Sequence, residues 1–405
     1  MRRILIVLTF VVVLLSVIIG GHIYLALRLV VDPGITPPLR DALFVLIAGL
    51  GATLFLQPIG ERILRPPLAR VISWPASLWM GFAFLLLTLV AVSDATWSLL
   101  GATTVASAAS GGASTAAARA RALGVLSIAL VAGLVGVRAA LRGPMVRRVE
   151  VRLARWPAQL DGFRIVQLSD IHIGPILGRR FAEQVVARCN ALVPDLIAVT
   201  GDLVDGTVRR IGAEVAPFAD LHARHGVFFI TGNHDHYSGA DEWVERVQAL
   251  GIRVLRNDRI TIGSDGAAFE LAGVEDHHAH LLSGTHQEDL PQALNGRDPS
   301  RPLILLAHDP ATFHEAARLG VDLQLSGHTH GGQIWPFRYL VRLSTPYVAG
   351  SYTKNGSQLY VSCGTGFWGP VMRLGAPAEI TEIIVRCALA APSPGRVSPG
   401  GPFDP

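Results

Sequence analysis

Aspartate, asparagine and histidine side chains gather in five short clusters between residues 169 and 330. The clusters are Ser169-Asp170-Ile171-His172, Gly201-Asp202-Leu203-Val204-Asp205, Gly232-Asn233-His234-Asp235, Ala307-His308-Asp309 and Gly327-His328-Thr329-His330. Carboxylate oxygens and imidazole nitrogens in such numbers suit hard-to-borderline divalent cations. Two such cations a few ångströms apart are a common device for hydrolysing phosphate esters. The residue types therefore predict a dinuclear metal centre.

Seven of these side chains are the candidate metal ligands. They are Asp170, His172, Asp202, Asn233, His308, His328 and His330. Asp202 has two carboxylate oxygens and can bridge two cations. One division gives Asp170, His172, Asp202 and His330 to the first cation, and Asp202, Asn233, His308 and His328 to the second. Mn²⁺ is the first expectation, while Fe and Zn stay open, because imidazole and carboxylate ligands bind all three metals.

Two further residues in the clusters are candidates for catalysis. Two cations that share a bridging water lower its pKa, so a metal-bridging hydroxide can attack the phosphorus at neutral pH. The cations also offset the charge that develops during in-line attack. His234 is adjacent to the ligand Asn233 and is expected outside the metal shell, where it can protonate or stabilise the leaving oxygen. Asp205 is expected to orient the imidazole of His234.

Any one of these clusters alone is weak evidence, because Gly-Asn-His-Asp is an ordinary turn sequence and Asp-x-His is no more specific. The prediction depends on five clusters in order, the first three of which each follow an apolar run. Another histidine tract, His277-His278-Ala279-His280, lies in a polar loop outside the clusters. A solvated loop is its first interpretation, and the rim of the active site is the alternative.

The segments that position these clusters alternate between strand-like and helix-like patterns from about Glu150 onward. Strands are expected at Phe163–Leu168, Asp195–Thr200, Val227–Thr231, Ile252–Leu255, Arg259–Ile262, Phe269–Val274, Leu303–Ala307, Leu323–Leu325, Leu359–Ser362 and Ile380–Val385, and helices at Arg179–Leu192, Ala213–Arg224 and Ala240–Leu250. This alternation predicts an α/β domain with strands inside and helices outside. Ligands in such domains gather where strands end, and the clusters occupy those positions.

The first 142 residues are apolar and carry few charges. Four runs stand out: Ile4 to about Leu27, Ala42 to about Gln57, Pro75 to Val92, and Ala122 to Val137. A bilayer core of roughly 30 Å needs about 20 apolar residues, so the runs predict a multi-span transmembrane helical region of about four helices. A cleaved signal peptide is the alternative for the first run, and buried core helices are the alternative for the shorter second and fourth. The segment Thr103–Ala118 is too weakly apolar to count as a fifth span.

These patterns divide the chain into four parts. They are a transmembrane region at 1–142, a basic juxtamembrane linker at 143–160, the α/β domain at 161–388 and a Pro/Gly/Ser-rich tail at 389–405 that is expected to be disordered. With the N-terminus inside, most arginines near the spans face the cytoplasm. We therefore expect an integral, multi-pass protein of the cytoplasmic membrane with its catalytic domain on the cytoplasmic side. Cys189, Cys363 and Cys387 lack CxxC spacing and are expected to be buried thiols.

The ordered clusters closely resemble the motif series DxH, GDxxD, GNHD/E, a lone His and GHTH of the calcineurin-like metallophosphoesterase family. Ser169–His172, Gly327–Gln333 and Gly273–Asp276 look most like the bacterial membrane-associated, YkuE-type branch, which includes some UDP-diacylglucosamine hydrolases. The resemblance covers about residues 160–386. It implies a four-layer αββα sandwich and the division of ligands given above.

Three functions follow as hypotheses. The first is a membrane-anchored, dinuclear-metal-dependent phosphoesterase that hydrolyses phosphodiester or pyrophosphate bonds, with a lipid-linked or nucleotide–lipid substrate and membrane lipids as partners. The second is a nuclease or cyclic-nucleotide phosphodiesterase on the same scaffold. Nucleic acid is not the expected partner, because the strongest basic cluster is juxtamembrane and does not line a groove in the domain. The third is a non-catalytic membrane sensor, against which the full ligand set and His234 weigh.

Overall fold

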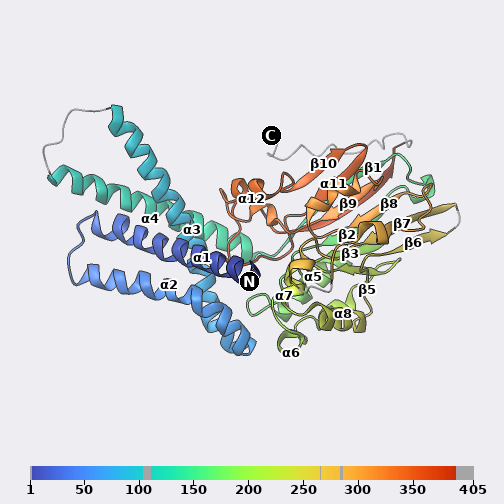
Figure 1. Ribbon diagram of the computed structural model, residues 1–405, viewed down its shortest axis with the longest axis horizontal. Coiled ribbons are helices and arrows are strands. Elements are labelled where there is room, and N and C mark those ends of the chain that lie inside the picture. Colours follow the sequence, from blue (N-terminus) through green and yellow to red (C-terminus); the bar gives the residue numbers. More distant parts are fainter. Residues whose placement is uncertain (1, 104–110, 265, 283–285, 389–405) are drawn as a thin grey trace.

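The computed structural model describes residues 2–103, 111–264, 266–282 and 286–388. Within them, four long helices precede a two-sheet sandwich, and the two parts lie beside each other (Figure 1). The tail at 389–405, which is predicted to be disordered, lies outside the described residues.

The described N-terminal part consists of long helices joined by short connections. Its helices are α1 (Arg2–Ala26), α2 (Leu39–Ile63), α3 (Pro66–Thr103) and α4 (Gly111–Leu141), and a π-helix over Leu27–Val31 extends α1. All four are long and apolar enough to cross a membrane, so the expected number of candidate spans is confirmed among the described residues. Because α4 begins at Gly111, the later part of the weakly apolar segment Thr103–Ala118 extends the fourth helix.

Two six-stranded sheets form the sandwich. The first has the order β1 (Met145–Leu153), β12 (Glu379–Cys387), β2 (Phe163–Leu168), β3 (Leu196–Thr200), β4 (Val227–Ile230) and β5 (Arg253–Val254). The second has the order β10 (Gly350–Lys354), β11 (Ser357–Val361), β9 (Leu323–Ser326), β8 (Leu303–Leu306), β7 (Ala267–Gly273) and β6 (Asp258–Ser264). Strands β2 to β5 are parallel, and so are β7, β8, β9 and β11. Within each group, the carboxyl ends of the strands therefore lie at one edge.

Helices cover the outer face of each sheet. They are α5 (Arg179–Asn190) and α8 (Ala240–Ala249) on the first sheet, and α10 (Leu290–Leu294) and α11 (Phe313–Ala316) on the second. Val166 of β2 shares a buried cluster with Val185 of α5 and Trp243 of α8. Its neighbour Ile165 points the other way, into the core between the sheets, as the alternation of strand side chains requires. The layers are those of the predicted four-layer αββα sandwich.

Residues 143–160, expected to be a basic linker, contain the edge strand β1. This strand pairs in parallel with β12 over its full length. Arg147 and Arg148 contact the buried carboxylates of Glu379 and Glu382, at 3.5 Å and 2.7 Å. Side chains of alternating character in β1 put Val151 into the core while the arginines stay at the edge. The run of arginines concealed this alternation in the sequence.

The helix expected at Ala213–Arg224 is wrong. The structure has a four-residue helix α6 (Val208–Ile211) and a 3₁₀ turn over Ala216–Asp220. Pro217 explains the difference, because proline has no N–H to donate and disfavours a helical conformation at the residue before it. Strand β10 is a further element that the sequence did not predict.

The helices and the sandwich pack directly against each other. The backbone N–H of Val371 donates to Ser77 of α3 at 2.9 Å, and that of Arg373 donates to the carbonyl of Gly136 in α4 at 2.9 Å. Met372 between them is buried, and its side chain fills the space beside Gly81 and Gly136. The segment Val371–Arg373 therefore joins the two parts of the molecule.

Candidate metal centre

The seven predicted ligands come together at the edge of the sandwich where parallel strands end. Asp170, Asp202 and Asn233 follow β2, β3 and β4 of the first sheet, and His308 and His328 follow β8 and β9 of the second. The two sheets thus present their ligands to one another across a single site. The order of motifs along the chain becomes a spatial cluster because the carboxyl ends of parallel strands converge.

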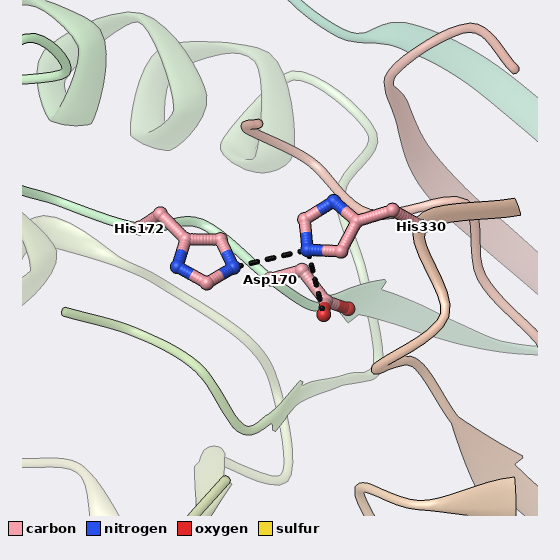
Figure 2. Close-up of side chains that lie close together, drawn as sticks. All are labelled: Asp170, His172 and His330. Carbon is pink, nitrogen blue, oxygen red and sulfur yellow. Dashed lines mark hydrogen bonds and ion pairs between the residues drawn. The ribbon is translucent and has the colours of Figure 1, made fainter. Parts of the chain in front are cut away.

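One group of candidate ligands consists of Asp170, His172 and His330. The Nε2 atoms of His172 and His330 lie 3.0 Å apart, and Nε2 of His330 lies 3.3 Å from a carboxylate oxygen of Asp170 (Figure 2). All three side chains are buried. Their lone pairs therefore converge on one point where a cation can be bound.

A second group consists of Asp202, His308 and His328, with Asn233 beside them. Nδ1 of His328 lies 3.3 Å from Nε2 of His308 and 2.9 Å from the amide oxygen of Asn233. The same carboxylate oxygen of Asp202 is 3.2 Å from Nε2 of His308 and 3.8 Å from Nε2 of His172. Asp202 thus lies between the two groups, in the position of a bridging ligand.

The imidazole rings of His172 and His308 each make a hydrogen bond through Nδ1, which leaves Nε2 available to bind a divalent cation. Nδ1 of His172 lies 3.0 Å from Asp205, and Nδ1 of His308 lies 2.8 Å from the carbonyl oxygen of Thr200. A neutral imidazole that donates through Nδ1 has its lone pair on Nε2, which in both residues faces the other ligands. Such outer partners fix the tautomer and the orientation of metal-binding histidines.

Arg373 supports His330 from behind. Its guanidinium is buried and donates to the carbonyl oxygens of Cys363 at 2.6 Å and His330 at 3.3 Å. Burial, then the neighbouring His172 and Arg373, hold the pKa of His330 well below its usual value. The ring is therefore neutral, which is the form that binds a metal. Arg373 lies in a loop far from the motifs, so the sequence does not reveal this role.

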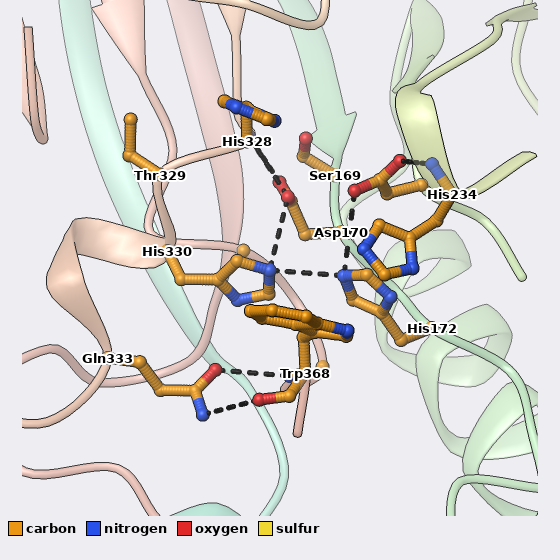
Figure 3. A network of polar contacts seen from close by, with 12 residues as sticks. Ser169, Asp170, His172, His234, His328, Thr329, His330, Gln333 and Trp368 are labelled. Carbon is orange, nitrogen blue, oxygen red and sulfur yellow. Dashed lines mark hydrogen bonds and ion pairs between the residues drawn. The ribbon is translucent and has the colours of Figure 1, made fainter. Parts of the chain in front are cut away.

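His234 lies next to the ligands, with Asp205 beneath it. Nδ1 of His234 is 2.7 Å from Asp205, and its backbone N–H donates to Asp202 at 2.8 Å. Burial alone would lower the pKa of His234, but the carboxylates of Asp202 and Asp205 raise it to about 9. Asp205 contacts both His172 and His234, so one carboxylate orients a ligand and the candidate acid. The indole of Trp368 packs edge-on against His234 at 5.3 Å between ring centroids (Figure 3).

Asp235 is a structural residue of the site whose role the sequence did not reveal. Its buried carboxylate accepts backbone N–H groups from Gly232 at 2.8 Å, Asp202 at 2.9 Å and Leu203 at 3.0 Å. It therefore ties the loop after β3 to the loop after β4. The signal in the sequence that Asp235 belongs to the site is its position directly after Asn233-His234.

The backbone of the site is strained at the ligands. Five of the seven have a positive φ: Asp170, His172, Asp202, His328 and His330. Positive φ is uncommon for residues other than glycine and clusters at functional sites. The motif glycines permit the close approach of these loops, since a Cβ on Gly232 would collide with the carboxylate of Asp202 and one on Gly327 with Asp170.

The second histidine tract lies at the rim of the site. Nδ1 of His278 is 3.5 Å from Asp309, and its ring stacks on the ligand His328 at 6.2 Å between centroids. His277 pairs instead with Glu288, and both histidines are half-exposed. The structure favours the rim interpretation for His278 over a detached solvated loop. The three cysteines are buried and free, as expected.

Comparison with known proteins gives matches over the sandwich. Residues 163–332 match the family model described as calcineurin-like phosphoesterase. A "Transmembrane protein with metallophosphoesterase domain" from Bos taurus is 40% identical over 272 residues, covering 64% of this chain and 61% of that protein. The uncharacterized metallophosphoesterase YkuE of Bacillus subtilis is 34% identical over 238 residues, covering 57% of this chain and 81% of that protein. The chain spans 61% and 62% of the length of its relatives from Bos taurus and Danio rerio.

Among solved structures, the NAD nucleotidase of Haemophilus influenzae is similar with a TM-score of 0.37 and 20% identity, covering 50% of each chain. That likeness is too distant to bear on the substrate. The relative from Bacillus subtilis is matched over 81% of its length and therefore establishes the family. It is the family that the motifs at the strand ends indicate. The chain belongs to the calcineurin-like metallophosphoesterase family.

Proposed function

We propose that the chain is a membrane-anchored, dinuclear-metal-dependent phosphoesterase that hydrolyses phosphodiester or pyrophosphate bonds in a lipid-linked substrate. The observation that carries the proposal is the position of Asp202, whose carboxylate oxygen lies between His172 and His308. Two ligand groups that share one carboxylate are what a pair of neighbouring cations requires.

In this proposal, Asp170, His172, Asp202 and His330 hold one cation, and Asp202, Asn233, His308 and His328 hold the other. When bound there, two divalent cations would supply a hydroxide nucleophile at neutral pH and would offset the charge on the phosphate. Mn²⁺ is the proposed metal, with Fe or Zn as the alternatives that the same ligands accept.

The chain's own residues complete the reaction. The carboxylates of Asp202 and Asp205 raise the pKa of the His234 ring, which favours its protonated form. Asp205 binds Nδ1 of His234, which leaves Nε2–H to donate to the leaving oxygen. Burial would raise the pKa of Asp205, but His172 and His234 hold it below its usual value, so it stays a carboxylate. His234 is thus the proposed general acid, and Asp205 the residue that positions it.

The four candidate spans support anchoring in a membrane, and the names of two relatives include the word transmembrane. We propose the cytoplasmic membrane, with the sandwich on its cytoplasmic side, because this orientation places most flanking arginines inside. A reporter fused to the C-terminus tests the orientation. Activity of an extracytoplasmic reporter would reverse it.

A nuclease is the weaker proposal. The basic run that could bind a nucleic-acid backbone lies in β1, where Arg147 and Arg148 contact Glu379 and Glu382. Arginines that are paired with carboxylates are poorly placed to neutralise phosphates. Nucleic acid is therefore not the proposed partner.

The test uses the purified full chain in nanodiscs with and without Mn²⁺. Bis-p-nitrophenyl phosphate, a panel of lipid pyrophosphates and single-stranded DNA are the substrates. We expect metal-dependent turnover of the first two classes, and a loss of about 10²–10³-fold in Asp202→Asn, because the bridging carboxylate is removed. Asp220→Asn, an exposed aspartate away from the ligands, is the matched control. No metal-dependent turnover of any substrate would refute the proposal.

A further inference from the structure

Directly after the last metal ligands, the chain exposes an unusual series of large apolar side chains. They belong to the segment that leads into α12 (Arg338–Ser344), to α12 itself and to the neighbouring loop. These side chains, which we name the apolar strip, are Trp335, Phe337, Tyr339, Leu340, Leu343 and Trp368. Each is at least 42% exposed, and Leu343 reaches 83%.

This concentration differs from the rest of the sandwich. The other large apolar side chains that the described part of the sandwich exposes occur singly or in one adjacent pair: Met145, Val146, Val193, Tyr237, Leu281 and Leu319. Isolated exposed apolar residues are normal, whereas a contiguous apolar patch marks a surface that is covered by something. The strip places five such side chains within nine residues of chain.

The strip is continuous with the candidate spans. Ile334, which precedes it, belongs to the buried cluster of the helices together with Leu85 of α3 and Ala129 of α4. Phe337 makes an edge-to-face contact with Phe84 of α3, at 5.9 Å between centroids. Figure 1 shows α12 on the side of the sandwich that faces the helices. The strip therefore begins at the contact between the sandwich and the part of α3 that contains Phe84 and Leu85.

The strip is also continuous with the metal centre. The side-chain amide of Gln333 donates to the backbone carbonyl oxygen of Trp368 at 2.8 Å and accepts from the backbone N–H of Trp368 at 3.1 Å. The indole ring of Trp368 packs edge-on against the imidazole of His234. Figure 3 shows the indole next to His172, His234 and His330. Trp368 thus belongs at once to the strip and to the wall of the site.

We propose that the apolar strip lies in the boundary between head groups and acyl chains of the membrane that α1 to α4 span, and that the metal centre takes its phosphate from a lipid head group there. The second half of this proposal rests on the proposed function. Tryptophan and tyrosine prefer that boundary. Arg342, exposed in α12 between Leu340 and Leu343, can reach anionic head groups while its alkyl chain stays among the apolar side chains.

The position of the strip is tested without any assay of activity. Leu343→Cys is labelled with an environment-sensitive fluorophore in the full chain, in vesicles that contain brominated phospholipids. Cys189, Cys363 and Cys387 are buried, so the label reacts at the new cysteine. Ser264→Cys, at the end of β6 on the side away from the helices, is the control (Figure 1). We expect the brominated lipids to roughly halve the emission at position 343 relative to vesicles without bromine. We also expect this emission to be blue-shifted relative to position 264, as for a group about 5–10 Å into the boundary. Equal, weak quenching at both positions would overturn the proposal.

The source of the phosphate is tested by comparing two substrates. The measured quantity is the ratio of two turnover rates, that of a phosphate ester lipid in vesicles and that of soluble bis-p-nitrophenyl phosphate. The double variant Leu340→Glu, Leu343→Glu should lower this ratio by about tenfold, since two carboxylates oppose insertion of the strip into the membrane. Leu343→Phe, which preserves the apolar surface, should leave that ratio close to the wild-type value. An unchanged ratio in the double variant would refute lipid access through the strip. If the wild type hydrolyses neither substrate, both the proposed function and the proposal that the phosphate comes from a lipid head group are refuted. The quenching experiment still decides whether the strip lies in the membrane boundary.

Discussion

The metal centre and the contact between the helices and the sandwich meet at two neighbouring residues, because Arg373 supports His330 and Met372 packs against the helices, yet the two regions are built from opposite contacts. At the metal centre, buried carboxylates and imidazoles hold one another through specific hydrogen bonds, and five ligands adopt strained backbone conformations. At the contact with the helices, Met372 packs against Gly81 and Gly136 by shape. The first region depends on the identity of each polar atom, whereas the second depends on volume.

This difference makes contrasting predictions. Changes at the metal centre should alter chemistry and metal affinity, and should depend on pH. Changes at the contact should alter stability alone, and should be insensitive to pH. Three substitutions at or beside the metal centre and one at the contact with the helices test this difference.

The largest effect is expected for His234→Ala. Loss of the general acid should lower kcat by about 10²–10⁴-fold for an ester with an alkyl leaving group. The loss should be much smaller for bis-p-nitrophenyl phosphate, because p-nitrophenolate leaves without a proton. Steady-state rates on both substrates measure this, and His222→Ala, an exposed histidine away from the site, is the control. Equal losses on both substrates would contradict the role of His234 as acid.

Met372→Ala should lower the free energy of unfolding by about 2–5 kcal/mol, because it leaves a cavity between α3, α4 and the sandwich. Thermal unfolding of the full chain in detergent, followed at several pH values, measures the effect. Met372→Leu should cost less than about 1.5 kcal/mol, since volume is conserved. A loss of stability that changed strongly with pH would not fit a contact built on shape.

Glu275 is a buried carboxylate beside the loop after β4, where it accepts a hydrogen bond from the hydroxyl of Thr231 at 2.7 Å. Glu275→Gln is expected to act in a pH-dependent way. Burial would raise the pKa of Glu275, but His236, Thr231 and Arg256 lower it from 4.5 to about 2. A depressed folded-state pKa contributes stability above the unfolded-state value of 4.5, and the contribution disappears as pH falls towards 2. The variant should therefore lose about 2–3 kcal/mol at pH 7, and the difference from wild type should shrink between pH 4.5 and 2. A constant difference across that range would show that ionisation of Glu275 is irrelevant.

Asp235→Asn should give the smallest effect of the four. The amide still accepts some of the four backbone hydrogen bonds, but its NH₂ group opposes the remaining donors. We expect metal affinity to fall about 10–100-fold, as for other residues that position ligands. Equilibrium dialysis against Mn²⁺ measures this without turnover. Wild-type affinity would mean that the loop after β3 keeps its shape without Asp235.

The sequence predicted seven candidate ligands, a candidate acid at His234 and its partner Asp205, because each lies in a short motif that follows an apolar run, and runs of strand length can be recognised locally. The structure brings these nine residues together. Asp235 and Arg373 were missed for a different reason. Their roles consist of hydrogen bonds to backbone groups of other loops, and backbone groups leave no trace in the sequence. The edge strand β1 was missed because its arginines read as surface charge, whereas in the structure they contact carboxylates of β12.

The sequence by itself determined which atoms can bind metal and which segments are apolar enough to cross a membrane, since both follow from residue type and local order. Only the tertiary structure decided that Asp202 lies between two ligand groups, that one carboxylate serves both His172 and His234, and that Trp368 connects the site to the apolar strip. These relations join residues from different strands and loops. They exist only once two sheets and a helical bundle have packed into one arrangement, because packing sets the distances that chemistry requires.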